Sequence, residues 1–282
     1  MHYKHCIFSL ASLALSTIHC MASMKIISIA NQKGGTGKSA TTHALGAVLA
    51  SELERRVLMV DIDPQSSLTE ASGVGDAEGV SLAEVLGGAT PGKTKLKDII
   101  VEVSENLFLA PADLALAATE LGLASRMGRE NVLKKALATV ESGFDVALID
   151  CPPSLSLLTV NALTAADAVL IPTQPQAVDL RGLSLFLETL QNIRQELNPE
   201  LETLGILPTF FDRRLTHHRD AIEAMERAEL PVMQVKIGRS VRVAEAAASG
   251  ETVVTFDPKN PQAQAYRELA EAINQWLNDK QI

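Results

Sequence analysis

The sequence predicts an α/β protein with a doubly wound, mostly parallel sheet and helices on both faces. From residue 24 onward, short apolar segments typical of buried strands alternate with longer segments of helical periodicity. Hydrophobic residues make up 46% of the chain and aromatic residues only 4%. This composition suits helices packed on a parallel sheet better than an aromatic-rich β-sandwich.

The first 23 residues differ from the rest of the chain. The apolar run Cys6–Leu15 resembles the hydrophobic core of a secretory signal, but it is too short to cross a bilayer as a helix. A strand and a glycine-rich loop follow it almost at once. We therefore interpret residues 1–23 as a disordered or non-native extension, with Met21 or Met24 as the natural start, and residues 24–282 as a single domain.

Candidate strands recur along this domain. The first, Ile26–Ala30, precedes a glycine-rich loop and a helix expected over Ser39–Leu53. A second surface loop is expected at Gly87–Lys93. The other expected strands are Arg56–Asp63, Leu107–Ala110, Val146–Asp150, Ala168–Pro172, Leu204–Pro208 and Val232–Val235.

Apolar periodicity predicts two helices in the C-terminal part of the chain. The apolar face of the first consists of Leu183, Phe186, Leu187, Leu190, Ile193 and Leu197. The apolar face of the second consists of Tyr266, Leu269, Ala270, Ile273 and Leu277. Both faces are expected to pack in the core. Strands that alternate with helices form a parallel sheet, whose ligands bind at the carboxyl ends of the strands.

The glycine-rich loop predicts a phosphate site. Gly34, Gly35 and Gly37 lie between a strand and a helix, where backbone N–H groups can surround phosphate oxygens. Lys38 would reach the β- and γ-phosphates, and the hydroxyl of the next residue, Ser39, would bind Mg²⁺. The usual pattern G-x-x-x-x-G-K-[ST] is not met, because a glutamine replaces its first glycine and a lysine directly precedes the glycines.

That departure resembles the deviant P-loop of the ParA and MinD ATPases. In that family the extra lysine, here Lys33, reaches across a dimer to the partner's phosphates, as an arginine finger does. The resemblance implies an ATP hydrolase that uses ATP and Mg²⁺ and forms a homodimer on binding ATP. The expected ATP contacts are Lys33, Gly34, Gly35, Thr36, Gly37, Lys38, Ser39, Ala40, Pro208 and Gly238.

Two acidic strand ends accompany the loop. An aspartate at such a position is usually a cap or a turn residue, but two that flank one P-loop favour a function. The first segment resembles the family's first switch, in which Asp63 positions or activates the attacking water. The second resembles its Walker B strand and second switch, in which Asp150 holds the Mg²⁺ shell. The resemblance implies Lys33, Lys38 and Asp63 as catalytic residues and Ser39, Asp63 and Asp150 as metal ligands.

The resemblance covers nearly everything from Met24 to the C-terminus. Gly205–Arg214 is similar to the strand and loop near the adenine, and Ile237–Ala246 is similar to the segment usually written I-P-R-N-V-R-x-x-E-A. Gly238 replaces the proline of that segment and Ser240 replaces its asparagine, next to the expected adenine pocket.

The net charge of −9 excludes a protein coated in positive charge, so any contact with nucleic acid must come from a local cluster. ParA proteins bind double-stranded DNA without sequence preference through basic residues. The residues that match these positions or lie beside them are Arg213, Arg214, Arg219, Arg239 and Arg242. The alternative is that these arginines form ordinary surface ion pairs with Asp212, Asp220 and Glu245. The neighbouring His217 and His218 are expected to face solvent.

Three functions compete. The first is a cytoplasmic, nucleoid-associated positioning ATPase whose ParB-like partner stimulates hydrolysis, with a chromosome, a plasmid, a carboxysome or other cargo. The second is a membrane-cycling regulator of the MinD kind, but the C-terminal segment Glu271–Ile282 has one lysine and no cationic face, which disfavours stable membrane binding. The third is a ligase or an iron–sulfur reductase. A ligase would not need Lys33, and a cluster needs more thiolates than Cys151 supplies.

Overall fold

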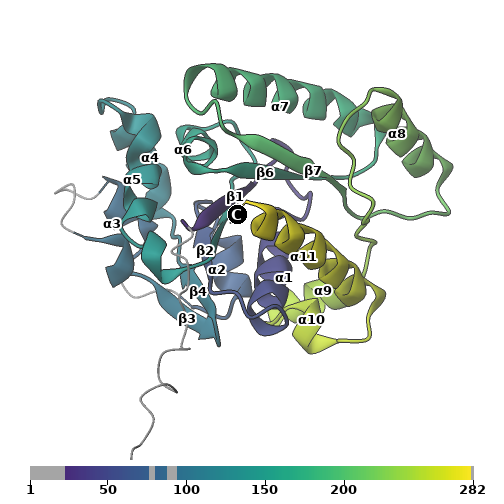
Figure 1. Cartoon of the computed structure of the whole chain (residues 1–282), viewed down its shortest axis with the longest axis horizontal. Helices are drawn as coiled ribbons and strands as arrows, with labels where there is room; N and C mark the ends of the chain where they lie inside the picture. The colour runs from purple at the N-terminus through teal and green to yellow at the C-terminus, as the bar shows by residue number, and fades with distance from the viewer. Residues whose placement is uncertain (1–22, 76–79, 88–93, 281–282) are drawn as a thin grey trace, which may run out of the picture.

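The computed structural model describes residues 23–75, 80–87 and 94–280. Residues 1–22 of the expected extension and residues 88–93 of the expected loop lie outside these ranges. Within them, the chain forms one seven-stranded sheet in the order β3-β4-β2-β5-β1-β6-β7 (Figure 1). The strands are β1 (Lys25–Ile29), β2 (Val57–Asp61), β3 (Val101–Ser104), β4 (Leu107–Ala110), β5 (Val146–Asp150), β6 (Ala168–Thr173) and β7 (Glu202–Pro208).

Every neighbouring pair of strands is parallel except β3 and β4, which confirms the predicted mostly parallel sheet. The edge strand β3 was not predicted. In its sequence, Val-Glu-Val-Ser, half-buried and exposed side chains alternate, which is typical of a strand with one face exposed to solvent. The central strands β2 and β5 are buried throughout, which explains why their sequences are nearly continuous apolar runs.

The strand expected at Val232–Val235 was wrong. Only Val232 forms a bridge to Ile206 of β7, with one backbone hydrogen bond on each side of it. Pro231 has no N–H to extend the ladder, and the chain bends after Met233.

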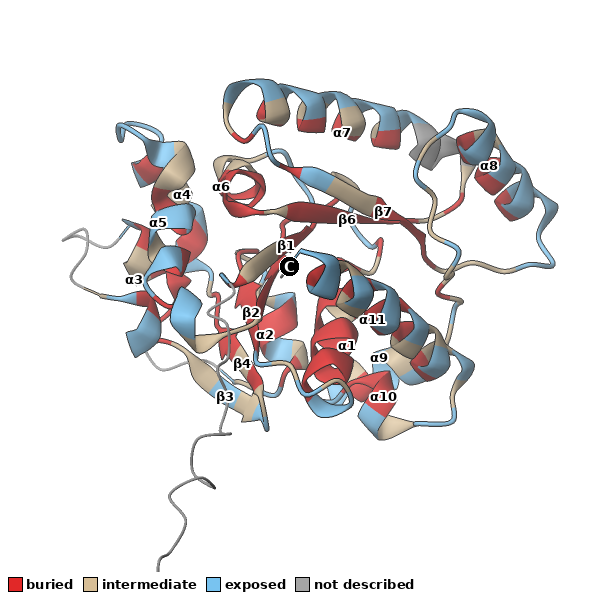
Figure 2. Cartoon of the chain, in the orientation of Figure 1, coloured by how far each residue is buried: buried red, intermediate tan, exposed pale blue. Residues whose placement is uncertain are grey.

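Helices cover both faces of the sheet (Figures 1 and 2). The helices are α1 (Lys38–Ser51), α2 (Ser67–Ala71), α3 (Leu82–Gly87), α4 (Ala115–Leu123), α5 (Val132–Ala138), α6 (Leu157–Ala165), α7 (Ala177–Glu196), α8 (Thr216–Arg227), α9 (Val241–Ala248), α10 (Val253–Phe256) and α11 (Pro261–Asp279). Short 3₁₀ turns lie at Leu96–Asp98, Arg129–Asn131 and Glu141–Gly143.

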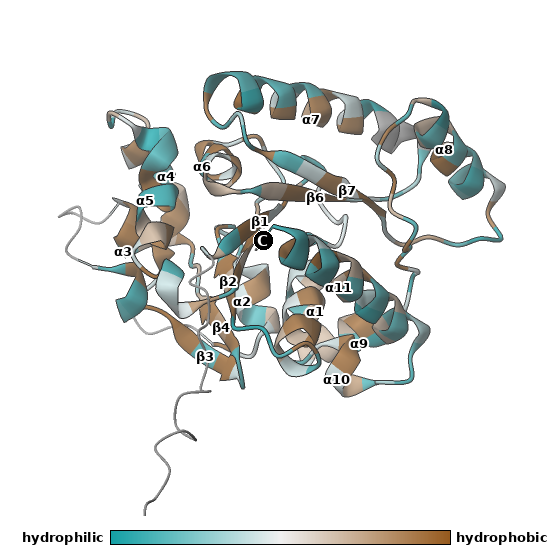
Figure 3. Ribbon diagram, in the orientation of Figure 1, coloured by the Kyte–Doolittle hydropathy of each residue, from teal (hydrophilic) through white to brown (hydrophobic). Residues whose placement is uncertain are grey.

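The sheet separates two apolar layers. One layer packs the sheet against α1, α10 and α11, and the other packs it against α3 to α8. The predicted apolar face of α11 is fully buried, and on α7 four of the six predicted residues are buried while Leu187 and Leu197 are half-buried. Figure 3 shows these hydrophobic faces turned toward the sheet.

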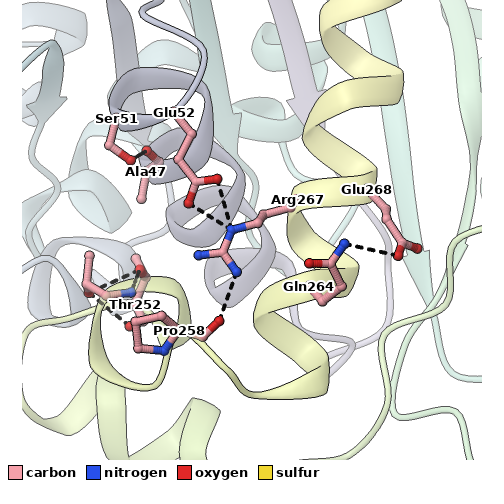
Figure 4. Close-up of polar contacts among 9 residues, drawn as sticks. Ala47, Ser51, Glu52, Thr252, Pro258, Gln264, Arg267 and Glu268 are labelled. Atoms are coloured by element: carbon pink, nitrogen blue, oxygen red, sulfur yellow. Dashed lines mark hydrogen bonds and ion pairs between the residues drawn. The ribbon is translucent and has the colours of Figure 1, made fainter.

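A polar clamp holds α11 against the end of α1 (Figure 4). Arg267 of α11 donates from Nε to both carboxylate oxygens of Glu52, at 2.8 and 2.9 Å, and from Nη1 to the carbonyl oxygen of Pro258 at 2.9 Å. At the start of α11, Asn260 accepts the Gln262 N–H at 3.0 Å, and Pro261 occupies the first turn, where its missing N–H costs no helix bond. The clamp therefore joins α11 to the C-terminal end of the helix that begins at the glycine loop.

Candidate nucleotide-binding site

The glycine loop joins the carboxyl end of β1 to the N-terminus of α1. Gly35 has a φ of 71° and Gly37 a φ of 83°, a left-handed conformation that favours glycine. Gly37 is the N-cap of α1 and provides no side-chain cap, so the N–H groups of the first turn have no partner within the helix. This arrangement is a helix N-terminus open to an anion.

Three polar residues that were not among the predicted site residues hold this loop. Asn31 donates to the Pro172 carbonyl oxygen at 2.8 Å and accepts the Lys33 N–H at 3.0 Å. Thr209 donates to the carbonyl oxygen of Thr36, and Gln174 donates to that of Gly35, both at 2.8 Å. Gln174 and Thr209 directly follow β6 and β7, and Asn31 lies two residues after β1, so their position at strand ends was the signal that could have found them.

Lys38 is buried at the start of α1, and its Nζ donates to the carbonyl oxygen of Lys33 at 3.3 Å. Burial lowers the pKa of Lys38, and the nearby charge of Asp150 opposes that shift. The half-buried Lys33 lies at the other end of the glycines. The two predicted lysines are thus brought to one loop.

Two buried carboxylates lie side by side at the ends of neighbouring strands. Asp61 ends β2, Asp150 ends β5, and the two residues are paired in the sheet register. Burial raises the pKa of Asp150 well above its usual range, as does the charge of Asp61, whereas a hydrogen bond from Ser39 and the charge of Lys38 oppose the shift. Burial also raises the pKa of Asp61 to about 6.

Asp61, which was not among the predicted site residues, organises the first switch. Its Oδ2 accepts the N–H of Thr69 at 2.9 Å and the Thr69 hydroxyl at 2.8 Å, and its Oδ1 accepts the N–H of Asp63 at 3.1 Å. Asp63 is buried, and its Oδ1 accepts the N–H of Gln65 at 2.9 Å. Asp61 is therefore a positioning residue for Asp63.

The surroundings of Asp150 fit a hydrated magnesium ion. Its Oδ2 is buried without a hydrogen-bond partner among the described residues, and its Oδ1 lies 3.4 Å from the Thr42 hydroxyl. Ser39 adjoins the same carboxylate. Mg²⁺ prefers oxygen ligands and keeps several waters, so one hydroxyl and one carboxylate form an appropriate set. The described residues contain no group of three or more His, Cys, Asp or Glu that could hold a metal.

Gly238 and three of the predicted DNA-binding arginines line a single cleft of about 560 Å³, which we call the basic cleft. Its remaining lining comes from the chain after β7 and the start of α11. The lining residues are Phe211, Asp212, Arg213, Arg214, Lys236, Gly238, Arg239, Pro261, Gln262 and Ala265. Pro208, predicted beside the adenine, is not among them. It is buried at the end of β7, and its carbonyl oxygen accepts the Ile237 N–H at 2.8 Å.

Gln262 occupies the space beside Gly238. Its Oε1 accepts the Gly238 N–H at 2.5 Å, and a Cβ added at Gly238 would lie 2.9 Å from its Nε2. The side chain of α11 therefore takes the room that a larger residue at position 238 would need.

The predicted arginines fall into two groups. Arg214 pairs with Asp212 at 3.0 Å, and Arg242 pairs with Glu245 at 2.8 Å, so the ion-pair alternative holds for these two residues. The others are Arg213, Arg219 and Arg239, which form no ion pair with described residues. The Arg219 guanidinium donates to the Thr216 hydroxyl at 3.3 Å, and the Arg239 guanidinium lies 5.9 Å from the centre of the Phe210 ring.

The expectation for His218 was wrong, because His218 is buried and accepts the Asp212 N–H at its Nδ1, 3.0 Å away. His217 is exposed, as expected. No helix within residues 23–75, 80–87 and 94–280 is both long and apolar enough to cross a membrane.

Comparisons with known proteins agree with this site. A family model described as an AAA domain matches residues 24–203. Sporulation initiation inhibitor protein Soj from Bacillus subtilis is 39% identical over 251 residues, which cover 88% of this chain and 98% of Soj. Chromosome partitioning protein ParA from Caulobacter vibrioides is 38% identical over 264 residues, covering 92% of this chain and 97% of ParA. The crystal structure of cobyrinic acid a,c-diamide synthase from Mycobacterium smegmatis with bound ADP and magnesium has a TM-score of 0.78 and 41% identity, covering 89% of this chain and 94% of that one.

Three features define the class of this protein as a P-loop nucleotide hydrolase. They are the mostly parallel sheet, the glycine loop that directly precedes a helix, and the acidic residues at neighbouring strand ends. With relatives of this identity and coverage, the chain belongs to the ParA/Soj family of ATPases. The predicted class and the predicted ATP hydrolysis are thereby confirmed. The ADP and magnesium in the mycobacterial structure agree with the predicted cofactors, ATP and Mg²⁺.

Proposed function

We propose that this ATPase is a positioning switch in which MgATP closes a homodimer and Lys33 of each subunit reaches the phosphates bound by the other. One observation carries the proposal. The glycine loop bears two lysines, and Lys38 is buried against the loop carbonyl of Lys33 at the phosphate end of α1. The loop already has a lysine for its own phosphates, Lys38. Lys33 adds a second cation at the outer rim of the loop, where its positive charge would stabilise the phosphoryl group transferred in a facing subunit.

Within one subunit, the chain's own groups perform the remaining tasks. Lys38 and the N–H groups of the loop bind the phosphates, and Ser39 and Asp150 hold magnesium, which neutralises phosphate charge when bound. Asp63 orients the attacking water. Its Oδ1 accepts the Gln65 N–H, which orients the carboxylate, and its remaining acceptor sites are open to water.

The Asp63→Ala variant should bind ATP and dimerise but hydrolyse at least about 100-fold more slowly, because removing a water-orienting group costs 10²–10⁴-fold. A malachite-green phosphate assay measures turnover, and sedimentation velocity reports the dimer. A normal turnover rate would assign water activation to another residue.

The basic cleft supports non-specific DNA binding. It gathers Arg213, Arg239 and Lys236 on a protein whose net charge is −9. Phosphate contacts from such a cluster bind DNA without reading its sequence. A ParB-like partner carried by a chromosome, a plasmid or other cargo would then stimulate hydrolysis and release the protein from DNA. In this proposal the protein acts in the cytoplasm on the nucleoid.

One experiment separates this proposal from a membrane-cycling regulator. The full chain is mixed with random-sequence duplex DNA or with anionic liposomes, with MgATP or MgADP. We expect binding to DNA with MgATP, weaker binding with MgADP and none to liposomes. Binding to liposomes alone would contradict the proposal.

The mycobacterial neighbour raises a second candidate, a metabolic synthase, because that protein is named for amide formation on cobyrinic acid and is 41% identical to this chain. The two functions differ in what accelerates ATP hydrolysis. Turnover that rises with cobyrinic acid and an ammonia donor, and is indifferent to DNA, would favour the synthase. Lys33 favours the positioning switch, since a one-subunit ligase has no use for a lysine that acts across a dimer.

A further inference from the structure

A second cavity lies away from both the nucleotide site and the basic cleft. It has a volume of about 550 Å³ and lies between α3, the 3₁₀ turn Leu96–Asp98, the turn Arg126–Gly128 and α5. We call it the α5 cavity. These elements lie on the side of the sheet that ends in β3, whereas the basic cleft follows β7 at the opposite end (Figure 1). No predicted site residue is among the described residues that line the α5 cavity.

The floor of the α5 cavity is apolar. It consists of Val85 of α3, Leu96, and Val132 and Ala136 of α5. Leu96 and Val132 belong to the buried core, and Val85 and Ala136 are half-buried and pack against it. Small-molecule sites are typically cavities of about 300–1,000 Å³ with an apolar lining and a few convergent polar groups. The volume and the floor therefore suit a small molecule with an apolar part.

Four cations surround this floor. Lys95, Lys97, Arg126 and Lys135 line the cavity and are exposed. They form no ion pair with described residues, and no aspartate or glutamate is among the described residues of the lining. Like charges around one cavity repel one another, and an anion bound between them would offset that repulsion. On a chain with a net charge of −9, this cavity therefore favours an anionic ligand.

The contacts of these cations leave them able to bind a ligand. Arg126 donates through Nη1 to the carbonyl oxygen of Leu86 at 3.2 Å, which holds the guanidinium beside the cavity. Its other N–H groups form no hydrogen bond with described residues, and a guanidinium has five donors. Asp98, which directly follows Lys97, caps the 3₁₀ turn by accepting the Lys95 backbone N–H at 3.1 Å. Its carboxylate forms no ion pair with described residues, so it does not neutralise the lysines.

The wall formed by α5 is connected to the second switch. Asn161 of α6 is fully buried, and its Oδ1 accepts the N–H of Val132, the first residue of α5, at 3.0 Å. On the same helix, the Thr159 hydroxyl donates to the carbonyl oxygen of Ser154 at 2.7 Å. Ser154 lies four residues after Asp150 in the second switch. A ligand that displaces α5 would therefore act through α6 on the segment that carries Asp150.

The chemistry of the α5 cavity selects the class of its ligand. An inorganic anion would leave the apolar floor in contact with water, and an uncharged apolar molecule would leave the four cations without a partner. A DNA duplex is far larger than a cavity of about 550 Å³. A small organic molecule that carries both an apolar part and several negative charges meets all of these conditions.

We infer that the α5 cavity binds a small organic anion with at least two negative charges and an apolar part, such as the phosphate ester of an aromatic alcohol, and that its binding is transmitted through Asn161 and α6 to the second switch. Binding at this cavity requires neither DNA nor a dimer. Its test is therefore independent of the proposed function.

The binding test uses 1-naphthyl phosphate as the probe, with saturating MgADP to occupy the P-loop. Equilibrium dialysis measures the probe Kd of the wild-type chain, of Lys135→Glu and of Lys134→Glu. Lys134 is the exposed neighbour of Lys135 on α5 and does not line the cavity, so its variant controls for the change in net charge. Lys135→Glu should weaken probe binding by about tenfold or more, because a charge-assisted contact is lost, whereas Lys134→Glu should leave it nearly unchanged.

Two further probes test the class of ligand. Inorganic phosphate has only the charge and 1-naphthol only the apolar part, so each should bind at least about tenfold more weakly than the ester. Far-UV circular dichroism should be unchanged in both variants, because both positions are exposed. A wild-type chain that does not bind the ester, or an equal loss of binding in the two variants, would overturn the site. Equal binding of the ester and inorganic phosphate would overturn the organic class of ligand.

The connection through α6 is tested by the affinity for MgADP. Isothermal titration calorimetry measures the MgADP Kd with and without saturating probe, in the wild-type chain and in Lys135→Glu. Direct competition of the probe at the P-loop is the same in both chains. Any additional change in the wild-type chain therefore comes from the α5 cavity, and it should reach about fivefold, the lower end of typical coupling between two sites. An equal effect of the probe on both chains would overturn the connection.

Discussion

Lys33 and Lys38 are five residues apart in one loop, yet their surroundings assign them different tasks. Lys38 is buried as the first residue of α1, at the end of the helix that adjoins the glycine loop. Lys33 is half-buried at the rim. In the proposed function, the same residue type therefore serves phosphate binding at position 38 and, across the dimer, catalysis at position 33.

Replacing Lys38 with Ala should weaken ATP binding by about 100-fold or more, because a charge-assisted contact to phosphate is lost in a buried site. Lys33→Ala should bind ATP with nearly normal affinity as a monomer and lose the ATP-dependent dimer. Isothermal titration calorimetry measures the first effect and sedimentation velocity the second. An unchanged ATP affinity in the Lys38 variant would refute its assignment.

His43 is a buried histidine on α1 that lines a cavity of about 190 Å³ with Ser39, Glu251 and Tyr266. Burial lowers its pKa to about 4, so the folded protein holds the neutral ring. Below pH 6.5, the usual pKa of about 6.5 means that His43 binds a proton in the unfolded chain but remains neutral in the folded chain. The stability that His43 allows is therefore present above pH 6.5 and is lost as the pH falls toward 4.

From this linkage, His43 alone should lower the free energy of unfolding by about 2 kcal/mol between pH 7.5 and pH 5. Urea unfolding at both pH values measures it. His43→Leu should remove most of that pH dependence. Equal pH dependence in the His43 variant and the wild type would show that other groups dominate.

At the scale of elements, α1 and α11 meet through two kinds of contact. Apolar residues such as Leu269 and Ile273 are buried between α11 and the sheet, whereas Arg267 clamps Glu52 and Pro258 at a partly exposed edge (Figure 4). Because surface ion pairs contribute little, the buried face holds α11 in place and the clamp selects its register.

Leu269→Ala should therefore lower the free energy of unfolding by about 2–5 kcal/mol, the usual cost of a cavity in a packed core. Arg267→Ala should lower it by less than about 1 kcal/mol. Chemical denaturation of both variants measures the difference. A clamp variant as unstable as the core variant would mean that the polar contact organises this layer.

At the scale of the whole molecule, a net charge of −9 surrounds a cleft lined by Arg213, Arg214, Lys236 and Arg239. Asp212 pairs with Arg214 and reduces the effective charge of the cleft. Arg213, Lys236 and Arg239 form no ion pair with the described residues, so the cleft carries a local positive charge on an acidic molecule.

Arg239→Glu should weaken MgATP-dependent binding to random duplex DNA by about tenfold or more at low salt and lower the salt slope by about 1, because one phosphate contact is lost. Gel shifts at matched ionic strengths measure both quantities, and ATP affinity should not change. Arg227→Glu, on α8 and already paired with Glu223, is the control. A normal gel shift for Arg239→Glu would place the DNA surface elsewhere.

Much of the architecture was accessible from the sequence because local chemistry specifies it. The strands Leu107–Ala110 and Val146–Asp150 were predicted with their observed bounds, since buried parallel strands are short apolar runs between turns. By contrast, the formation of the edge strand β3 and the absence of a strand at Val232–Val235 depend on backbone pairing with a neighbouring strand. A single segment of the sequence does not encode that pairing.

The sequence by itself determined the P-loop, its two lysines and the acidic strand ends, because each follows from residue type and spacing along one segment. Only the tertiary structure decided that Asn31, Gln174 and Thr209 hold the loop, and that Gly238 shares a cleft with three of the five predicted DNA-binding arginines. These contacts join residues up to 173 positions apart in the chain, as in the bond from Thr209 to Thr36. Their partners are set by the order of strands in the sheet, and no local pattern records that order.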